Sequence, residues 1–228
     1  MSTVKDTILV RTFKNDYIVN LDLFAKHSAR IATLKEAKQL PNVLDLTKYD
    51  VLAGATLCEF LAKADKTDVR ITVFALGDLI ELAIVLQMSS LLKKIDELIL
   101  ASSERDPYFR LHALSILSGF PHLLNSNTGR TILDLAVRDF KQISQSKTFS
   151  RLPVAIVLKI LNRCDLPVES EFDVAVAGLY WLTAKANRFH FTYRIMRCVR
   201  SAQLTAEQRD EIEQMAWKAS KHSEPVGK

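Results

Sequence analysis

The sequence predicts a mostly helical protein that begins with a small α/β domain. Short runs of β-branched and apolar residues occur only near the start, helical periods dominate from Leu21 onward, and no strand pattern follows residue 102. Only six glycines occur in 228 residues, which argues against a glycine-rich all-β protein. We therefore expect an α/β domain over residues 1–102, an all-α domain over 103–221 and a disordered tail over 222–228.

The first elements are predicted to form a β-hairpin. Thr7–Val10 and Tyr17–Val19 are rich in β-branched and apolar residues, and Lys14–Asp16 between them has the composition of a tight turn. A helical period then begins at Leu21 and includes Ile31, which predicts one helix that ends before Pro41.

The rest of the first domain is predicted to alternate between a short strand and helices. Val43–Leu46 is expected to be a strand, and Val51–Ala62 a helix. Thr72 could cap a helix over Val73–Gln87, which is apolar on nearly all sides and therefore expected at the centre of the domain. A last helix over Leu91–Leu100 should end at Ala101-Ser102-Ser103, where we place the domain boundary.

The second domain has recognisable helix starts and breaks. The uncharged stretch Leu111–Gly129 contains Gly119-Phe120-Pro121, which predicts two helices around a break and not a membrane span. Pro153 is expected at the first position of a helix. The apolar stripe of that helix comprises Val154, Val157, Leu158 and Leu161.

Two later helices are predicted to start with capping boxes. Ser170 with Asp173 forms a weak one, and Thr205 with Gln208 a better one. Trp181 should fill the core of the second domain, because it follows the first of these starts at helical spacing.

The net charge of +5 is unevenly distributed. Residues 1–102 hold 13 Lys and Arg against 13 Asp and Glu, whereas residues 103–228 hold 18 against 13. Between 185 and 200 there are five basic residues, no acidic one, and four interleaved aromatic or histidine residues. This stretch could bind nucleic acid. The alternative, which we favour, is an amphipathic helix with Ile195, Cys198, Val199 and Ala202 inward and Arg194 and Arg197 in solvent.

The sequence contains no recognisable catalytic motif. It lacks a phosphate-binding glycine loop and a Gly-x-Ser-x-Gly elbow, and its five histidines are scattered. Cys58, Cys164 and Cys198 are widely spaced, so we expect them to be buried free thiols in a reducing compartment. We therefore expect no enzyme activity, catalytic residue, metal or cofactor, no membrane span, and a cytoplasmic or nuclear location, or both.

Several residues resemble a known pair of domains. The first half resembles a BTB (POZ) domain and the second half a BACK domain, as in the N-terminal half of kelch-family cullin-3 adaptors. The BTB-like residues are Asp6-Thr7-Ile8-Leu9-Val10, Tyr17, Asn20, Leu23-Phe24, Ser28, Leu46, Tyr49-Asp50-Val51, Phe60 and Leu79–Met88. The BACK-like residues are Asp139-Phe140, Phe149, Leu152-Pro153, Asp165-Leu166-x-Val168-x-Ser170-Glu171-x-x-Val174, Trp181-Leu182 and Val199-Arg200.

The resemblance implies a non-enzymatic interaction module, a BTB-mediated dimer that acts as an adaptor or scaffold for a cullin-3 ubiquitin ligase and also binds a cargo protein. Expected dimer residues are Asp6, Leu9 and Leu23, with an ordinary first strand as the alternative for Asp6 and Leu9. Expected cullin contacts are Leu34, Glu36, Phe109, Leu114 and Leu117. The alternative for Leu34 and Glu36 is an exposed helix end, and for the other three it is packing between helices.

The sequence also departs from the family pattern. Asn20 replaces the usual histidine, Ile31 replaces an aromatic residue, and the segment between Ser28 and Leu44 is about three residues short. No kelch repeat, MATH domain or zinc finger is present. A scaffold or transcriptional co-regulator that does not bind cullin, or a protein that modulates longer BTB proteins by heterodimerisation, therefore remains an alternative.

Overall fold

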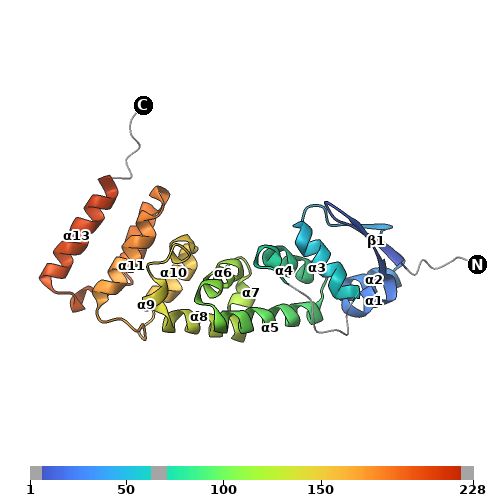
Figure 1. Ribbon diagram of the computed structural model, residues 1–228, viewed down its shortest axis with the longest axis horizontal. Helices are drawn as coiled ribbons and strands as arrows, with labels where there is room; N and C mark the ends of the chain where they lie inside the picture. Colours follow the sequence, from blue (N-terminus) through green and yellow to red (C-terminus); the bar gives the residue numbers. More distant parts are fainter. Residues whose placement is uncertain (1–6, 63–70, 222–228) are drawn as a thin grey trace, which may run out of the picture. The chain divides into compact units, whose positions relative to one another are not determined.

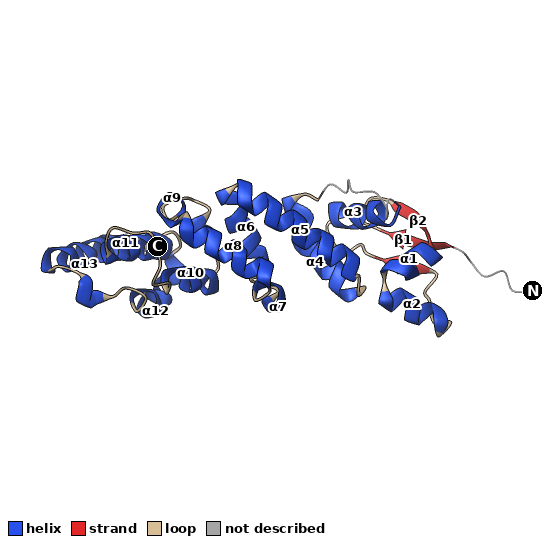
Figure 2. Ribbon diagram, turned by 90° about the horizontal axis from the view of Figure 1, so that it is seen from below, coloured by secondary structure: helices blue, strands red, loops and turns tan. Residues whose placement is uncertain are grey.

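The computed structural model describes residues 7–62 and 71–221 and confirms a mostly helical protein. The chain divides into two compact units, Met1–Ile99 and Leu100–Lys228, which we call unit 1 and unit 2. Figure 2 draws the strands in red, and all of them belong to unit 1, whereas the described part of unit 2 is helical. The predicted disordered tail, 222–228, lies outside the described residues.

Unit 1 combines one three-stranded sheet with helices (Figure 1). Its described elements are β1 Thr7–Arg11, β2 Asp16–Asn20, α1 Leu21–His27, α2 Ala29–Glu36, β3 Val43–Asp45, α3 Val51–Ala62, the 3-10 helix η1 Val73–Ala75, α4 Leu76–Val85 and the start of α5 Ser89–Arg105. The strand order is β2-β1-β3, with β2 antiparallel and β3 parallel to β1. The predicted hairpin is confirmed, and its turn is closed by Thr12, whose N–H donates to the Asn15 carbonyl at 2.9 Å.

The prediction of a single helix from Leu21 is wrong, because the chain forms two helices that meet at Ser28. Ser28 has an extended backbone, with φ −128° and ψ 109°. Its buried hydroxyl donates to the Leu86 carbonyl at 2.5 Å and accepts the Ile31 N–H at 3.1 Å. The serine therefore caps α2 and ties the break between the helices to the chain that follows α4.

Two predicted ends in unit 1 are also wrong. Thr72 makes no side-chain cap, and the segment after it begins as η1 before α4 starts at Leu76. The last helix does not end at Ala101-Ser102-Ser103, because α5 continues to Arg105. The expectation that the apolar helix lies at the centre of the unit is confirmed, since Leu79, Ile80 and Leu82 of α4 are almost completely buried.

Unit 2 is a series of helices of unequal length. Its described elements after α5 are α6 Pro107–Leu117, α7 Pro121–Leu124, α8 Asn127–Arg138, α9 Phe140–Ile143, η2 Phe149–Arg151, α10 Val154–Leu161, α11 Glu171–Thr183, η3 Ala186–Phe191, α12 Thr192–Met196, η4 Ser201–Gln203 and α13 Ala206–Lys221. The predicted break at Gly119-Phe120-Pro121 is confirmed, and Pro121 begins the single turn of α7.

Both predicted capping boxes are present. The Thr205 N–H donates to the Gln208 side chain at 3.0 Å, and the Gln208 N–H donates back to the Thr205 hydroxyl at 3.2 Å. The Asp173 carboxylate accepts the Ser170 N–H at 3.3 Å as part of the second box. These bonds satisfy first-turn N–H groups that have no partner inside the helix.

The core of unit 2 contains Trp181, as predicted. Its side chain is buried, and its indole N–H donates to the Leu152 carbonyl at 2.8 Å. The predicted α10 stripe is wrong in part, because Val154 and Leu158 are only half-buried. Ile156 and Ile160 are buried in their place, beside Val157 and Leu161. Pro153, expected at the first helical position, is the N-cap residue, one position earlier.

The cysteines differ in exposure, and the expectation that all three are buried is wrong for Cys164. We expect iodoacetamide to add one label to the native protein, at Cys164, as measured by intact mass and peptide mapping. Burial raises the pKa of the Cys58 thiol to about 12 and also raises the pKa of the Cys198 thiol. Both are therefore poor nucleophiles near neutral pH. A second label added before unfolding would contradict this expectation.

Candidate interaction surfaces

One face of the sheet of unit 1 carries a row of three apolar side chains that reach solvent. Leu9 of β1 lies opposite Ile18 of β2 and Val43 of β3. Cross-strand neighbours share a face, so these three side chains form an apolar row, opposite the face that buries Ile8 and Val10. Ile18 is 77% exposed, whereas Leu9 and Val43 are half-buried. The expected dimer residue Leu9 thus lies in a solvent-facing row.

A groove of about 350 Å³ lies beside this row, between β2, α1 and α3. Leu23, another expected dimer residue, is half-buried in its wall, and Ile18 lines the groove as well. The remaining lining residues are Tyr17, Val19, Asn20, Ala55, Cys58, Glu59, Leu61 and Ala62. The third expected dimer residue, Asp6, lies outside the described residues.

Ile18 is a candidate interface residue that is absent from the residues expected from the sequence. A signal was available, because β2 alternates and Val19 belongs to the buried face, so an isoleucine beside it must point to solvent.

The expected cullin contacts of unit 1 lie at the end of α2. Leu34 is half-buried and Glu36 is exposed, so both present surface to solvent. The helix ends where Lys38 adopts a positive φ of 54°, and the Gln39 N–H then donates to the Leu34 carbonyl at 2.9 Å. This geometry is a helix C-cap, which defines the backbone that carries both side chains.

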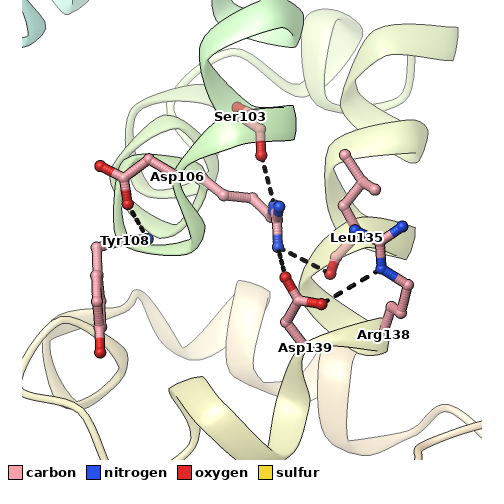
Figure 3. Close-up of polar contacts among 7 residues, drawn as sticks. Ser103, Asp106, Tyr108, Leu135, Arg138 and Asp139 are labelled. Atoms are coloured by element: carbon pink, nitrogen blue, oxygen red, sulfur yellow. Dashed lines mark hydrogen bonds and ion pairs between the residues drawn. The ribbon is translucent and has the colours of Figure 1, made fainter.

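A buried arginine organises the first helices of unit 2 (Figure 3). The Arg110 side chain is 1% exposed and forms an ion pair with Asp139. Its Nε donates to the Ser103 carbonyl at 2.9 Å, and its Nη1 donates to the Leu135 carbonyl at 3.1 Å. Arg110 therefore connects the end of α5, α6 and the end of α8 through one guanidinium group.

The carboxylate of Asp139 is stabilised in its charged form. Burial alone would raise its pKa, but hydrogen bonds and charge from Arg110 and Arg138 outweigh burial and hold the pKa below 3.8. The Ser103 hydroxyl is buried and has no hydrogen-bond partner in the described part of the chain. The sequence offered one signal for this cluster, a lone arginine in the apolar helix Pro107–Leu117.

The expected cullin contacts of unit 2 differ in exposure. Leu114 is 0% and Leu117 is 2% exposed. At these two positions the side chains are therefore buried, as the alternative of packing between helices expects. Phe109, next to Arg110, is half-buried and is the only one of the three with accessible surface. The structure thus does not bring these three side chains together on the surface of unit 2.

Two of the five basic residues in the stretch 185–200 have buried partners. Arg188 is buried, donates to the Ser150 carbonyl at 2.5 Å and the Trp181 carbonyl at 2.8 Å, and lies 4.1 Å from the Trp181 ring centroid. Arg200 donates through Nη1 to the buried carboxylate of Glu171 at 2.5 Å. Arg188 is thus withdrawn from the surface, whereas Arg200 is 40% exposed but already paired with Glu171.

The rest of the stretch largely follows the amphipathic interpretation. Ile195, Cys198 and Val199 are buried, as predicted, but Ala202 is exposed because α12 ends at Met196 and gives way to shorter turns. Arg194 and Arg197 are exposed.

Neither a metal centre nor a membrane span can be assigned to the described residues. Among residues 7–62 and 71–221, no group of three or more His, Cys, Asp and Glu side chains could hold a metal ion. No helix in the same residues has both the length and the apolar character that crossing a bilayer requires.

Comparison with known families identifies one region of the chain. Residues 125–213 match the family model BACK, described as BTB And C-terminal Kelch. The match lies within unit 2 and covers α8 to the first half of α13. A comparison with curated proteins gives no match. The BACK match supports a role in protein interaction, of the kind found in BTB-kelch proteins.

Proposed function

We propose that this chain is a non-enzymatic interaction module that dimerises through unit 1 and acts as an adaptor or scaffold in a cullin-3 ubiquitin ligase. The single observation that carries the proposal is the BACK match in unit 2, preceded in the chain by a separate α/β unit. A cargo protein would complete the assembly.

The proposed dimer uses the apolar surface of unit 1. This surface includes the solvent-facing row with Leu9 and Ile18 and the wall of the adjacent groove with Ile18 and Leu23. Apolar side chains in such a position are a recurrent sign of a protein interface. A two-fold interface would have to bury about 1,000 Å² to be stable, so residues beyond these three must contribute. Asp6 is included as an expected contact from the family resemblance.

The proposed cullin contact in unit 1 is Leu34 with Glu36. We expect the double variant Leu34→Ala, Glu36→Ala to bind the cullin-3 N-terminal domain about tenfold more weakly, because an apolar anchor and a charge are lost together. Isothermal titration calorimetry with the full chain measures this change. Lys93→Ala with Glu97→Ala, both exposed on α5, is the matched control and should bind as the unmodified protein does.

The calorimetry also tests the proposal itself. If the folded, unmodified protein gives no heat with the cullin-3 domain at tens of micromolar, a cullin adaptor is excluded. If the α2 variant and the α5 control bind equally well, the assigned contact is wrong.

A cullin-independent scaffold or transcriptional co-regulator is the second candidate. It is favoured by the burial of Leu114 and Leu117, which removes two of the five expected cullin contacts from the accessible surface. In this case the chain would dimerise, with itself or with longer BTB proteins, and would show no heat with cullin-3.

A further inference from the structure

Unit 2 contains a basic surface segment without acidic residues. Between residues 174 and 206 the chain has five Lys and Arg residues and no Asp or Glu. Arg188 is buried and Arg200, although exposed, is paired with Glu171, so the exposed cations without a carboxylate partner among the described residues are Lys185, Arg194 and Arg197. In the described part of the chain, no carboxylate pairs with the guanidinium of Arg194 or of Arg197. This surface therefore carries positive charge that the fold does not neutralise.

The two free arginines are held against aromatic rings. The Arg194 guanidinium lies over the Phe191 ring at 5.9 Å from its centroid, and the Arg197 guanidinium lies over the Tyr193 ring at 5.7 Å. These distances are within the reach of a cation–π interaction. A guanidinium over a ring loses little freedom on binding and still presents the N–H donors at its edge, which match a carboxylate in bidentate geometry.

The Phe191 ring is poorly available for stacking, and the exposed Tyr193 ring has the Arg197 guanidinium over it. Phe191 is half-buried, with its centroid 6.0 Å from that of Trp181 and 3.8 Å from that of His190. Arg194 lies over the same ring. Nucleic-acid bases need open ring faces on which to stack. The contacts around Phe191 thus favour a ligand that pairs with guanidinium edges over one that stacks on the rings.

We propose that His190, Phe191, Tyr193, Arg194 and Arg197, which we call the stacked-arginine patch, bind an acidic segment of a partner protein. Glutamate or aspartate side chains of the segment would accept hydrogen bonds from the two guanidinium groups. Tyr193, 73% exposed, offers the adjoining contact for an apolar neighbour of those carboxylates. The inference does not rest on the proposed cullin binding, because it concerns a different surface and a different ligand.

Fluorescence anisotropy with the full chain tests this inference. The probe is a short labelled peptide rich in glutamate, compared with the same peptide carrying glutamine in place of glutamate. We expect the glutamate peptide alone to bind, and Arg194→Glu with Arg197→Glu to weaken binding at least about tenfold. Arg194→Lys with Arg197→Lys keeps the charge but not the planar fork, so we expect an intermediate loss, about threefold.

The matched control is Arg130→Glu with Lys147→Glu, which changes the net charge equally at two exposed positions outside the patch. Its dissociation constant for the glutamate peptide should stay within about twofold of that of the unmodified protein. Any general effect of net charge should disappear as added salt screens it. Circular dichroism checks that all variants are folded.

Three results would overturn the inference. The first is no binding of the glutamate peptide to the unmodified protein. The second is an equal loss in the patch variant and the control, which would mean that net charge alone attracts the peptide. The third is tighter binding of oligothymidine than of the peptide, which would assign the patch to nucleic acid. Each outcome is distinguishable from loss of the proposed function, because cullin-3 calorimetry on the same variants should be unchanged.

Discussion

Replacement of Asp139 by alanine is expected to lower the free energy of unfolding of unit 2 by about 3 kcal/mol. The change leaves the Arg110 guanidinium, 1% exposed, without its counter-charge, and removing one partner of a buried ion pair costs about 3–5 kcal/mol. We take the lower figure because the Asp139 side chain is itself 21% exposed. Urea unfolding monitored by tryptophan fluorescence measures this change in the free energy of unfolding, because both tryptophans, Trp181 and Trp217, lie in unit 2.

The pH dependence of the same experiment separates charge from packing. In the folded protein the pKa of Asp139 lies below 3.8, because its hydrogen bonds outweigh the opposing effect of burial. Its contribution is thus present above the unfolded pKa and is lost as the pH falls through the folded one. Asp139→Asn should remove this acid sensitivity while keeping the shape of the side chain. A loss below about 0.5 kcal/mol for Asp139→Ala would contradict the account of this cluster.

Replacement of Gly129 by alanine is expected to destabilise unit 2 by about 1–3 kcal/mol, although alanine favours helices. Gly129 lies in the first turn of α8, where a Cβ atom would come within 2.5 Å of the Leu123 carbonyl oxygen and also meet the Leu124 carbonyl oxygen. Backbone atoms cannot rotate away as a side chain can. To relieve this clash, α7 and α8 would have to move apart. Thermal or urea unfolding would measure the resulting loss of stability.

Gly119→Ala is the matched control for this substitution. A Cβ atom at Gly119 would have its nearest neighbour, the Ile116 carbonyl oxygen, at 3.4 Å, and the position is exposed. We expect its free energy of unfolding to stay within about 0.5 kcal/mol of that of the unmodified protein. If alanine at 129 is as well tolerated as alanine at 119, the close approach of α7 to α8 is not a constraint on the fold.

Local patterns predicted those elements whose causes are local. The β-hairpin follows from β-branched runs around a turn, the two capping boxes from pairs three residues apart, and the central α4 from apolar residues on nearly all sides of the helix. Each of these signals is complete within a few residues, so the sequence alone was sufficient to find the element.

Two of the errors depend on partners that lie outside the local sequence pattern. The break at Ser28 depends on a hydrogen bond to the Leu86 carbonyl, 58 residues away. The extension of α5 to Arg105 includes Ser103, whose carbonyl accepts a hydrogen bond from Arg110 and whose side chain is fully buried. A serine-rich segment resembles a helix end when such partners are not known.

The candidate surfaces were predictable only in part, for the same reason. Leu34 and Glu36 lie at an exposed helix end, which both a cullin contact and a simple helix end require. The burial of Leu114, in contrast, depends on how α6 packs against α8. The composition of the basic stretch identified its five cations, but not which of them have partners within the fold. Arg188 is buried against Trp181, and Arg200, although 40% exposed, is paired with Glu171; both partners lie on a preceding helix.

The mass in solution of the chain mixed with the cullin-3 N-terminal domain tests the central claim most directly. By sedimentation equilibrium, the chain alone should have twice its monomer mass of 25.8 kDa, and the mixture should form one species with two copies of each protein. A 25.8 kDa species that sediments independently of the cullin domain, at concentrations where the chain is folded, would contradict both the dimer and the adaptor.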